Sequence, residues 1–215
     1  MTLPQQPLVS IDTVPFLFRD GVLEVLLAER IFEPFLGEAA LPGVLLAANE
    51  RLEEAALRAL DTKAGVDREF IRNITGAGVF DNPDRDPRGP TLSIVHAVVL
   101  EPQAPAAGRQ GVRLVRAAEA KGLPFDHDAI ITRTAGSVLD SLWVDAALTR
   151  ALLGQRFTTA DAARLTRELA AAAGRPEPVT SNLGRDLARN PALAKTTAAA
   201  APAGRGRPAA EWSWT

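Results

Sequence analysis

The segment LPGVLLAANERLEEAALRALDTKAGV, residues 41–66, decides the fold because it combines a glycine loop, an amphipathic helix and a helix stop. The predicted helix runs from Glu50 to Ala64. Spacings of three and four residues place its small and aliphatic side chains on one face, namely Leu52, Ala55, Ala56, Ala59 and Leu60. Gly65 suits the left-handed position that follows a helix. We therefore expect this face of the helix to point to the core.

Strand patterns surround this helix. Two β-rich runs before it, LVSIDTVPFLF and VLEVLLAER, are joined by Arg19-Asp20-Gly21. Asp-Gly adopts positive φ angles at low cost, so we predict a hairpin. Three more β-like runs follow the helix, FIRNITGAGVF, TLSIVHAVVL and VRLVRAA. The run FDHDAIITRTAGSVLDSLWVDAALTRALL is predicted to be helical, with a break near Gly136 or Trp143. This mixed order of strands and helices predicts an α/β (α+β) sandwich.

The composition is that of an ordinary globular protein, with 47% hydrophobic and 23% charged residues among 215. The sequence has no cysteine, which excludes disulfides and thiolate metal sites. No apolar run approaches the roughly 20 residues of a membrane span. The N-terminus MTLPQQPLVS lacks the basic-then-apolar layout of a secretory signal. We therefore expect a cytoplasmic protein with no membrane partner.

Charge is distributed unevenly along the chain, whose net charge is −2. Residues 151–215 hold nine Lys/Arg and five Asp/Glu, a charge of +4, so the first 150 residues carry −6. The basic part suits a polyanion as its partner, whereas the acidic part does not. We therefore predict two parts with different tasks, one domain over residues 1–142 and a second over residues 143–215.

The second domain begins with a predicted helix, FTTADAARLTRELAAAAG, which Gly174 ends. Thr158 is its predicted N-cap, and Asp161 follows three residues later, as in a capping box. A second helix, SNLGRDLARN, comes after the turn RPEP, and the Asn-Pro pair at 190–191 stops it. We expect Thr180 or Ser181 to cap this second helix.

Two β-like pieces complete the chain, LAKTTAA and AAEWSW, joined by the basic segment PAGRGRP. Two helices separated by a short turn, then a hairpin with a basic tip, are typical of a winged helix-turn-helix. The sequence therefore predicts a sandwich domain followed by a DNA-binding winged helix.

Residues 41–66 resemble the Nudix box, the signature of hydrolases that act on nucleoside diphosphates linked to another group. The family pattern Arg-Glu-hydrophobic-x-Glu-Glu-x-Gly-hydrophobic corresponds here to RALDTKAGV, residues 58–66. Four residues match the family pattern, namely Glu50, Arg58, Gly65 and Val66. Val44 replaces the second glycine of the loop. The resemblance implies a Nudix-like α/β/α sandwich with a mixed sheet.

The three family glutamates fall on Ala59, Thr62 and Lys63. Side chains at such spacings share one helix face, where three carboxylates can bind Mg²⁺, which neutralises a pyrophosphate and positions water. Alanine and threonine offer no carboxylate, and a lysine ammonium repels the cation. Asp61 is expected to point away from that face. The sequence therefore predicts a Nudix-like domain with no catalytic residue, no metal and no cofactor.

Two further segments resemble ADP-ribose-type Nudix proteins, DNPDRDPRGPTLSIVHAVVL and LPFDHDAII. At the other end, LGQRFTTADAARL and GRGRPAAEWSW resemble the start and the end of the winged helix in the Nudix-related transcriptional regulators of NAD metabolism. Those proteins are dimeric repressors that sense ADP-ribose or related NAD-derived nucleotides. The resemblance implies a homodimer with two partners, a palindromic double-stranded DNA operator and a small nucleotide effector such as ADP-ribose.

The second helix of a winged helix enters the major groove, where Asn pairs with adenine and Arg with guanine or phosphate. We expect the DNA-binding residues to be Thr180, Ser181, Asn182, Arg185, Arg189, Arg205 and Arg207. The first two would donate amide hydrogens to phosphate at the helix start, and the last two would contact DNA from the wing. A solvated helix face is the alternative for these arginines.

The effector site is predicted from basic and aromatic residues of the first domain, namely Arg30, Phe35, Arg85 and Arg88. Arg30 precedes the loop, and the other two arginines lie in the polar segment before a strand. The chain has no tyrosine, so stacking on a ligand requires phenylalanine or tryptophan. Two alternatives stay open, a Nudix-type nucleoside diphosphate hydrolase with displaced metal ligands and a non-enzymatic nucleotide-binding protein.

Overall fold

A seven-stranded mixed sheet forms the centre of the computed structural model, which describes residues 6–104, 110–196 and 210–215. The sheet strands are β1 (Leu8–Arg19), β2 (Val22–Glu29), β3 (Ala39–Ala40), β4 (Gly43–Leu45), β5 (Ile71–Phe80), β6 (Thr91–Leu100) and β7 (Val112–Arg116). The main path runs β3-β2-β1-β6-β5, with β4 paired to β1 and β7 to β2. β1 and β6 are parallel, and the other pairs are antiparallel. The predicted mixed sheet is therefore confirmed.

The predicted hairpin between the first two β-runs is confirmed. β1 and β2 pair antiparallel up to Arg19 and Val22, which leaves Asp20 and Gly21 as the turn. Both turn residues have positive φ angles, 53° and 79°, as a two-residue hairpin turn of this kind requires. Asp-Gly therefore fixes the register that aligns the two long strands.

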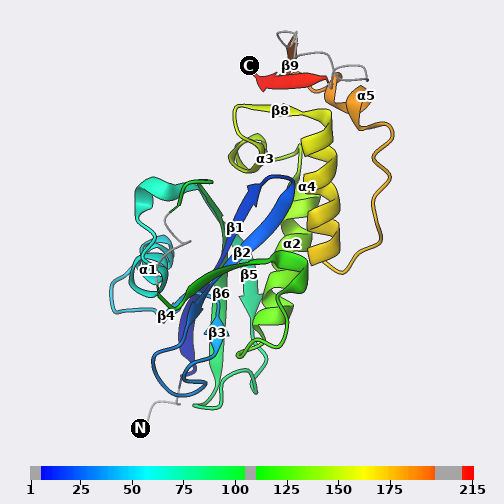
Figure 1. Ribbon diagram of the computed structural model, residues 1–215. Helices are drawn as coiled ribbons and strands as arrows, with labels where there is room; N and C mark the ends of the chain where they lie inside the picture. The colour runs from blue at the N-terminus through cyan, green and yellow to red at the C-terminus, as the bar shows by residue number, and fades with distance from the viewer. Residues whose placement is uncertain (1–5, 105–109, 197–209) are drawn as a thin grey trace.

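Helices cover both faces of the sheet, so the molecule has the layers of an α/β/α sandwich (Figure 1). One face carries α1 (Leu52–Ala59) and the π-helical turn that continues it over Leu60–Ala64. The other face carries α2 (His127–Ser141), α3 (Ala146–Leu153) and α4 (Thr159–Ala172). Short 3-10 turns lie at Arg68–Phe70 and Ala117–Glu119. The fold class predicted from the sequence is confirmed.

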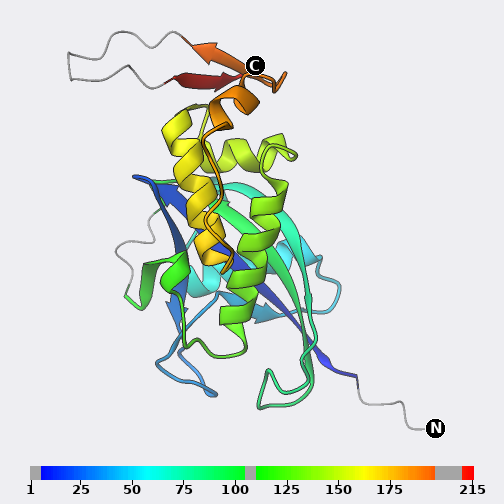
Figure 2. The ribbon, with the colours of Figure 1, turned by 90° about the vertical axis from the view of Figure 1, so that its right-hand side faces the viewer.

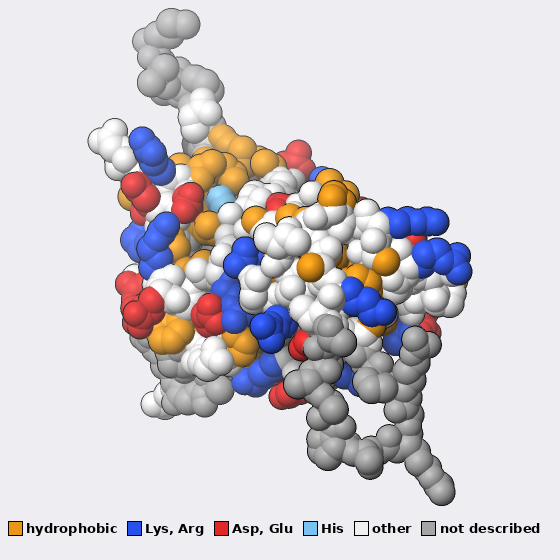
Figure 3. All heavy atoms as spheres, turned by 90° about the horizontal axis from the view of Figure 1, so that it is seen from above, with side chains coloured by type: hydrophobic (Ala, Val, Ile, Leu, Met, Phe, Trp, Pro, Cys, Tyr) orange, Lys and Arg blue, Asp and Glu red, His pale blue; other side chains and the backbone are white. Residues whose placement is uncertain are grey.

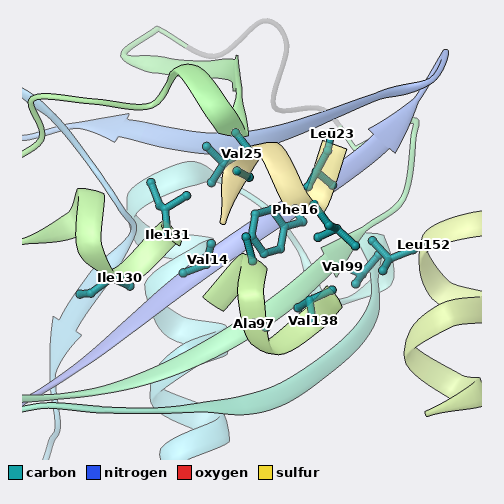
Figure 4. Close-up of a cluster of buried hydrophobic side chains, with 14 of the residues drawn as sticks. Val14, Phe16, Leu23, Val25, Ala97, Val99, Ile130, Ile131, Val138 and Leu152 are labelled. Atoms are coloured by element: carbon teal, nitrogen blue, oxygen red, sulfur yellow. The ribbon is translucent and has the colours of Figure 1, made fainter. Parts of the chain in front are cut away.

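Alternating residues of the central strands point to the two faces. On β1, Val14 and Phe16 belong to the larger core under α2, α3 and α4, whereas Leu17 belongs to the core under the π-helical turn. Figure 4 shows Val14 and Phe16 among side chains from strands and helices of the larger core, including Ile131 of α2. The period of two in LVSIDTVPFLF therefore decides which residues meet which helices.

The C-terminal part contains a second sheet of order β8-β10-β9, formed by β8 (Arg156–Thr158), β9 (Leu193–Thr196) and β10 (Glu211–Trp214). The predicted hairpin of the last two strands is confirmed. The strand β8 was not anticipated from the sequence. A five-residue helix, α5 (Leu183–Leu187), lies beside this sheet at the end of the molecule (Figure 1).

The helix α4 belongs to the main core as well as to the C-terminal part. Its residues Leu165 and Leu169 are fully buried in the same cluster as Val14 and Phe16 of β1. Figure 2 shows α4 and α2 lying side by side in front of the sheet. The core therefore continues across residue 143, and the domain boundary placed there stays a prediction.

The structure decides where the expected helix ends lie. Gly136 lies inside α2, so the break near that residue is wrong, whereas the break expected around Trp143 is confirmed, because the helix is interrupted between Ser141 and Ala146. Leu52, expected on the buried face of its helix, is 39% exposed, because α1 begins only at this residue. By contrast, Gly65 ends the helix with the predicted left-handed φ of 63°.

The capping predictions divide into one that is confirmed and one that is wrong. Thr158 and Asp161 form the capping box of α4 through reciprocal hydrogen bonds. At α5 the N-cap position falls on Asn182 rather than on Thr180 or Ser181, and no side chain caps it. The Thr180 hydroxyl instead accepts a hydrogen bond from Arg167 of α4, at 2.8 Å.

Among the described residues, no helix has the length and apolar character needed to cross a membrane.

Candidate functional site

A cavity of about 400 Å³ opens beside the C-terminal end of the helix that resembles the Nudix box. This Nudix-box helix consists of α1 and the π-helical turn that continues it to Ala64. Its walls come from the end of β2 and the loop after it, from β4, from the helix end at Lys63, from the segment Arg85–Arg88 and from the start of α2. A volume of this size is within the range of small-molecule sites. The cavity therefore collects segments that are more than 100 residues apart in the sequence.

The Nudix-box helix contributes no carboxylate to this cavity at the three family positions. Ala59 is fully buried, and the Thr62 hydroxyl donates a hydrogen bond to the Arg58 carbonyl at 2.6 Å. Lys63 is exposed and lines the cavity. Within the described ranges, no group of three His, Cys, Asp or Glu residues is arranged to hold a metal ion. Alanine, threonine and lysine at these three positions do not fit the divalent cation that a Nudix hydrolase uses.

The two charged residues that match the family pattern, Glu50 and Arg58, hold the loop in front of the helix. Arg58 donates two hydrogen bonds to Glu50, both 2.7 Å long, and a third to the Leu45 carbonyl at 3.0 Å. Glu50 also accepts the Ala47 amide hydrogen at 3.0 Å. The Arg58 hydrogen bonds and then that amide lower the pKa of Glu50 to about 2. This pair therefore keeps the box loop in shape, and Glu50 stays ionised at neutral pH.

A buried arginine forms the floor of the cavity. The Arg85 side chain is 2% exposed and pairs with Asp126 at 3.0 Å and with Asp12 at 3.4 Å. Asp12 also accepts a hydrogen bond from Ser93 at 2.5 Å. A buried guanidinium requires such partners, because an unpaired one is costly. Arg85 therefore ties β1, the polar segment and the start of α2 together.

Two more arginines lie over one aromatic ring. The guanidinium carbons of Arg30 and Arg88 lie 4.6 Å and 5.7 Å from the centroid of the Phe125 ring. Arg88 makes a bidentate pair with Asp86, with distances of 2.9 Å and 2.7 Å. Burial opposes ionisation of Asp86, but the Arg88 hydrogen bonds outweigh burial, so the pKa of Asp86 is lowered. The Phe125 ring therefore supports a cationic wall.

His127 at the start of α2 also lines the cavity, and its imidazole accepts a hydrogen bond from the box loop. Its Nδ1 accepts the Leu41 amide hydrogen at 2.9 Å, so the imidazole proton is at Nε2. Burial is the main cause that lowers the pKa of His127 to about 4. His127 therefore joins the box loop to α2 and stays uncharged at neutral pH.

The structure places three of the four predicted effector residues, Arg30, Arg85 and Arg88, on the cavity wall. Phe35 is not among the lining residues, because its ring packs edge-on against Phe125 with centroids 4.9 Å apart. The neighbouring Phe32 lines the cavity instead. The ligand-binding roles of these four residues stay predictions.

Three of the lining residues that sequence reasoning missed are polar residues with a clear place in the site, namely Asp12, Lys63 and His127. Asp12 had a detectable signal, since it is a carboxylate inside an otherwise apolar β-run. His127 lay in the quoted motif LPFDHDAII, but its role depends on Leu41, which is 86 positions away. Lys63 was considered only as a residue that repels a metal, and its position on the cavity wall comes from the structure.

Five of the seven predicted DNA-contacting residues are described, and Asn182, Arg185 and Arg189 lie at the end of the molecule that carries α5 and the small sheet. Asn182, Arg185 and Arg189 are exposed there, and Figure 3 shows Lys and Arg side chains spread over this face. Ser181 is exposed, whereas Thr180 is tied to α4. Arg205 and Arg207 lie outside the described residues. Contacts of all seven with DNA stay predictions.

Two curated relatives are similar to this chain. An ADP-ribose pyrophosphatase of Methanocaldococcus jannaschii is 34% identical over 119 residues, which is 52% of this chain and 68% of the relative. An ADPR-responsive transcriptional repressor, NtrR, of Acinetobacter baylyi is 31% identical over 96 residues, which is 44% of this chain and 37% of the relative. No family model matches the chain.

Solved structures share the fold. NrtR of Shewanella oneidensis in complex with a 27mer DNA has a TM-score of 0.72 at 24% identity, and the match covers 96% of this chain and 93% of that one. The NUDIX domain of the same protein in complex with ADP ribose has a TM-score of 0.55 at 29% identity, over 62% of this chain and 90% of that one. The first match extends the likeness in fold to the C-terminal part.

Proposed function

This chain belongs to the Nudix family, and on that premise we propose that it is a DNA-binding transcriptional regulator, acting as a repressor, whose Nudix-like domain senses ADP-ribose or a related NAD-derived or sugar nucleotide. The proposal assigns effector binding to the cavity beside Lys63 and DNA binding to the helices and hairpin of residues 143–215. It includes a homodimer that binds a palindromic operator.

One observation carries this proposal. The Nudix-box helix keeps its fold, its Glu50–Arg58 pair and a cavity, yet its three family carboxylate positions hold Ala59, Thr62 and Lys63. A site that retains its walls without its catalytic acids is suited to recognition rather than to hydrolysis. The repressor from Acinetobacter baylyi, described as ADPR-responsive, supports the same assignment.

The C-terminal part supports binding to DNA. Its described residues form a helix pair, α4 and α5, followed by the hairpin of β9 and β10. Arg185 and Arg189 are exposed on or beside α5 and carry positive charge toward solvent. Such a module makes few phosphate contacts, so useful affinity requires two copies on two half-sites about one helical turn apart, or multiples of that.

The experiment is a selection of genomic fragments by the full chain, followed by gel shifts with the enriched sequence in the absence and presence of ADP-ribose. We expect enrichment of a palindrome and a change in operator affinity when ADP-ribose is added. Equal recovery of unrelated fragments at all salt concentrations would contradict the role as a regulator. Light scattering on the free chain tests the predicted homodimer.

A Nudix-type hydrolase is the second candidate, and the 34% identity to an ADP-ribose pyrophosphatase favours it. Its test is the release of AMP from ADP-ribose by excess protein in Mg²⁺. Turnover that depends on Mg²⁺ would support the hydrolase. Failure to turn over, together with nucleotide binding but no DNA binding, would instead support a non-enzymatic nucleotide-binding protein.

A further inference from the structure

The basic side chains of the cavity fall into two groups. Five line it, namely Arg30, Arg58, Lys63, Arg85 and Arg88. Three of these have carboxylate partners, since Arg58 pairs with Glu50, Arg85 with Asp12 and Asp126, and Arg88 with Asp86. Among the described residues, Arg30 and Lys63 make no ion pair. The cavity therefore has two cations whose charge its own carboxylates do not directly balance.

Both cations contact Phe32, Arg30 through the backbone carbonyl and Lys63 through the aromatic ring. Arg30 donates to the Phe32 carbonyl at 3.2 Å, and the Lys63 ammonium lies 5.9 Å from the centroid of the Phe32 ring. Arg30 is held in place by a second hydrogen bond, to the Pro34 carbonyl at 2.7 Å. Lys63 is presented by the π-helical turn that Gly65 ends. The loop after β2 and the Nudix-box helix thus each present one cation to the cavity.

We propose that Lys63 takes the place of the divalent cation, so that the cavity binds the diphosphate of its nucleotide without metal, between the Lys63 ammonium and the Arg30 guanidinium. This inference rests on the proposed function, because it concerns how the same cavity recognises its effector. A lysine is a compact cation with three donors, and an arginine offers a planar fork to phosphate oxygens. Together they supply the positive charge that Mg²⁺ supplies where carboxylates hold it.

The positive charges on the cavity wall favour binding of an anion beside Arg30. Burial lowers the pKa of Arg30, and repulsion by Arg88 lowers it further. Both guanidiniums face the same Phe125 ring, so two like charges share one aromatic platform. Arg88 is already paired with Asp86, whereas the Arg30 side chain, within the part of the chain that the structure describes, hydrogen-bonds only to carbonyl groups. A dianionic group beside Arg30 would relieve this repulsion.

The test is calorimetric titration of the full chain with ADP-ribose, once in EDTA and once in excess Mg²⁺. The variants are Lys63→Met, Lys63→Arg and the matched control Lys121→Met, since Lys121 is exposed and does not line this cavity. We expect the wild-type affinity to agree within about twofold in the two media. Lys63→Met should weaken binding about tenfold in both media, as expected for the loss of one charge-assisted hydrogen bond. Lys63→Arg and Lys121→Met should stay close to wild type.

Different failures have different meanings. Wild-type binding that appears only in Mg²⁺, or Lys63→Met binding as tightly as wild type, overturns the metal-free mode and leaves the proposed regulator intact. Absence of ADP-ribose binding in both media overturns the sensing role itself, and the metal-free mode with it. Adenosine serves as a second ligand in competition with ADP-ribose. Because adenosine has no phosphate, Lys63→Met should leave its affinity unchanged, and an equal loss for both ligands would overturn a contact with the diphosphate.

Discussion

Arg116, the last residue of β7, donates two hydrogen bonds to Glu168 of α4, at 3.0 Å and 2.5 Å. Glu168 also accepts the Leu23 amide hydrogen of β2 at 3.3 Å. The carboxylate therefore joins the edge of the large sheet to the first helix of the proposed DNA-binding module. Its side chain is 11% exposed, compared with 69% for Glu119, the other partner of Arg116.

Glu168→Gln is expected to weaken the coupling between effector and DNA. Removing the charge breaks the bidentate pair while most of the side-chain volume remains. The ratio of operator affinities without and with ADP-ribose should move about fivefold toward one, within the usual range for residues that connect two sites. Gel shifts measure the ratio, and Glu119→Gln is the matched control because its exposed pair contributes little. An unchanged ratio in Glu168→Gln would remove this contact from the coupling.

Gly43→Ala is expected to disturb the floor of the cavity. A Cβ at Gly43 would overlap the Asp12 carboxylate, which is also a partner of Arg85. The free energy of unfolding should fall by about 1–3 kcal/mol, the usual cost of overpacking. Urea denaturation measures the change. Gly76→Ala on β5 is the control, since nothing lies within 4 Å of its added Cβ, and it should stay within about 0.5 kcal/mol of wild type.

Protonation of His127 is expected to make stability depend on pH. Burial lowers its pKa from 6.5 to about 4, so between these values the unfolded chain binds a proton that the folded chain does not. The contribution is therefore complete above pH 6.5 and is lost as the pH falls toward 4, by about 3 kcal/mol in total. Denaturation at pH 7.5 and at pH 4.5 should show a steeper loss in wild type than in His127→Gln. Equal losses in both proteins would contradict a neutral, buried imidazole.

Arg185→Ala is expected to weaken operator binding about tenfold without changing the oligomeric state. The side chain is exposed and, among the described residues, makes no ion pair, so its loss should not affect folding. If Arg185 contacts phosphate, the slope of log affinity against log salt should fall by about 1, whereas a base contact would relax specificity at one position. Arg113→Ala on β7 is the control. Unchanged affinity would assign Arg185 to a solvated helix face.

Restoring the three family carboxylates tests whether the metal was lost only through its ligands. The variant Ala59→Glu, Thr62→Glu, Lys63→Glu is expected to gain Mg²⁺ binding in calorimetric titration, because three acids at this spacing share one helix face. The corresponding triple glutamine variant has similar volume without charge and should not gain it. Since Ala59 is fully buried, the unfolding transition of each variant is measured first. A folded glutamate variant that binds no Mg²⁺ would indicate that the site has changed beyond its ligands.

The local sequence determined those turns and helix ends that depend only on residues close together in the chain. Asp20-Gly21 determined the first hairpin because few dipeptides adopt two positive φ angles. Thr158 and Asp161 determined where α4 begins, since a capping box needs only residues three apart. The period of two in the strands and the loss of the three family glutamates from the Nudix box were also readable, because each depends on residues that are close together in the sequence.

Tertiary structure alone decided the composition of the cavity and the position of α4. Arg85 meets Asp12 across 73 positions, and His127 meets Leu41 across 86, so no local pattern pairs them. Lys63 lies in the cavity because a π-helical turn and the loop after β2 bring it beside Phe32. The helix α4 is amphipathic by its sequence, but which surface its apolar face covers depends on the exposed apolar area that the sheet offers. Which side chains are buried and which charges pair depends on contacts between segments far apart in the sequence, because apolar surface is removed from water only where these segments pack together. These features are therefore visible only in the folded chain.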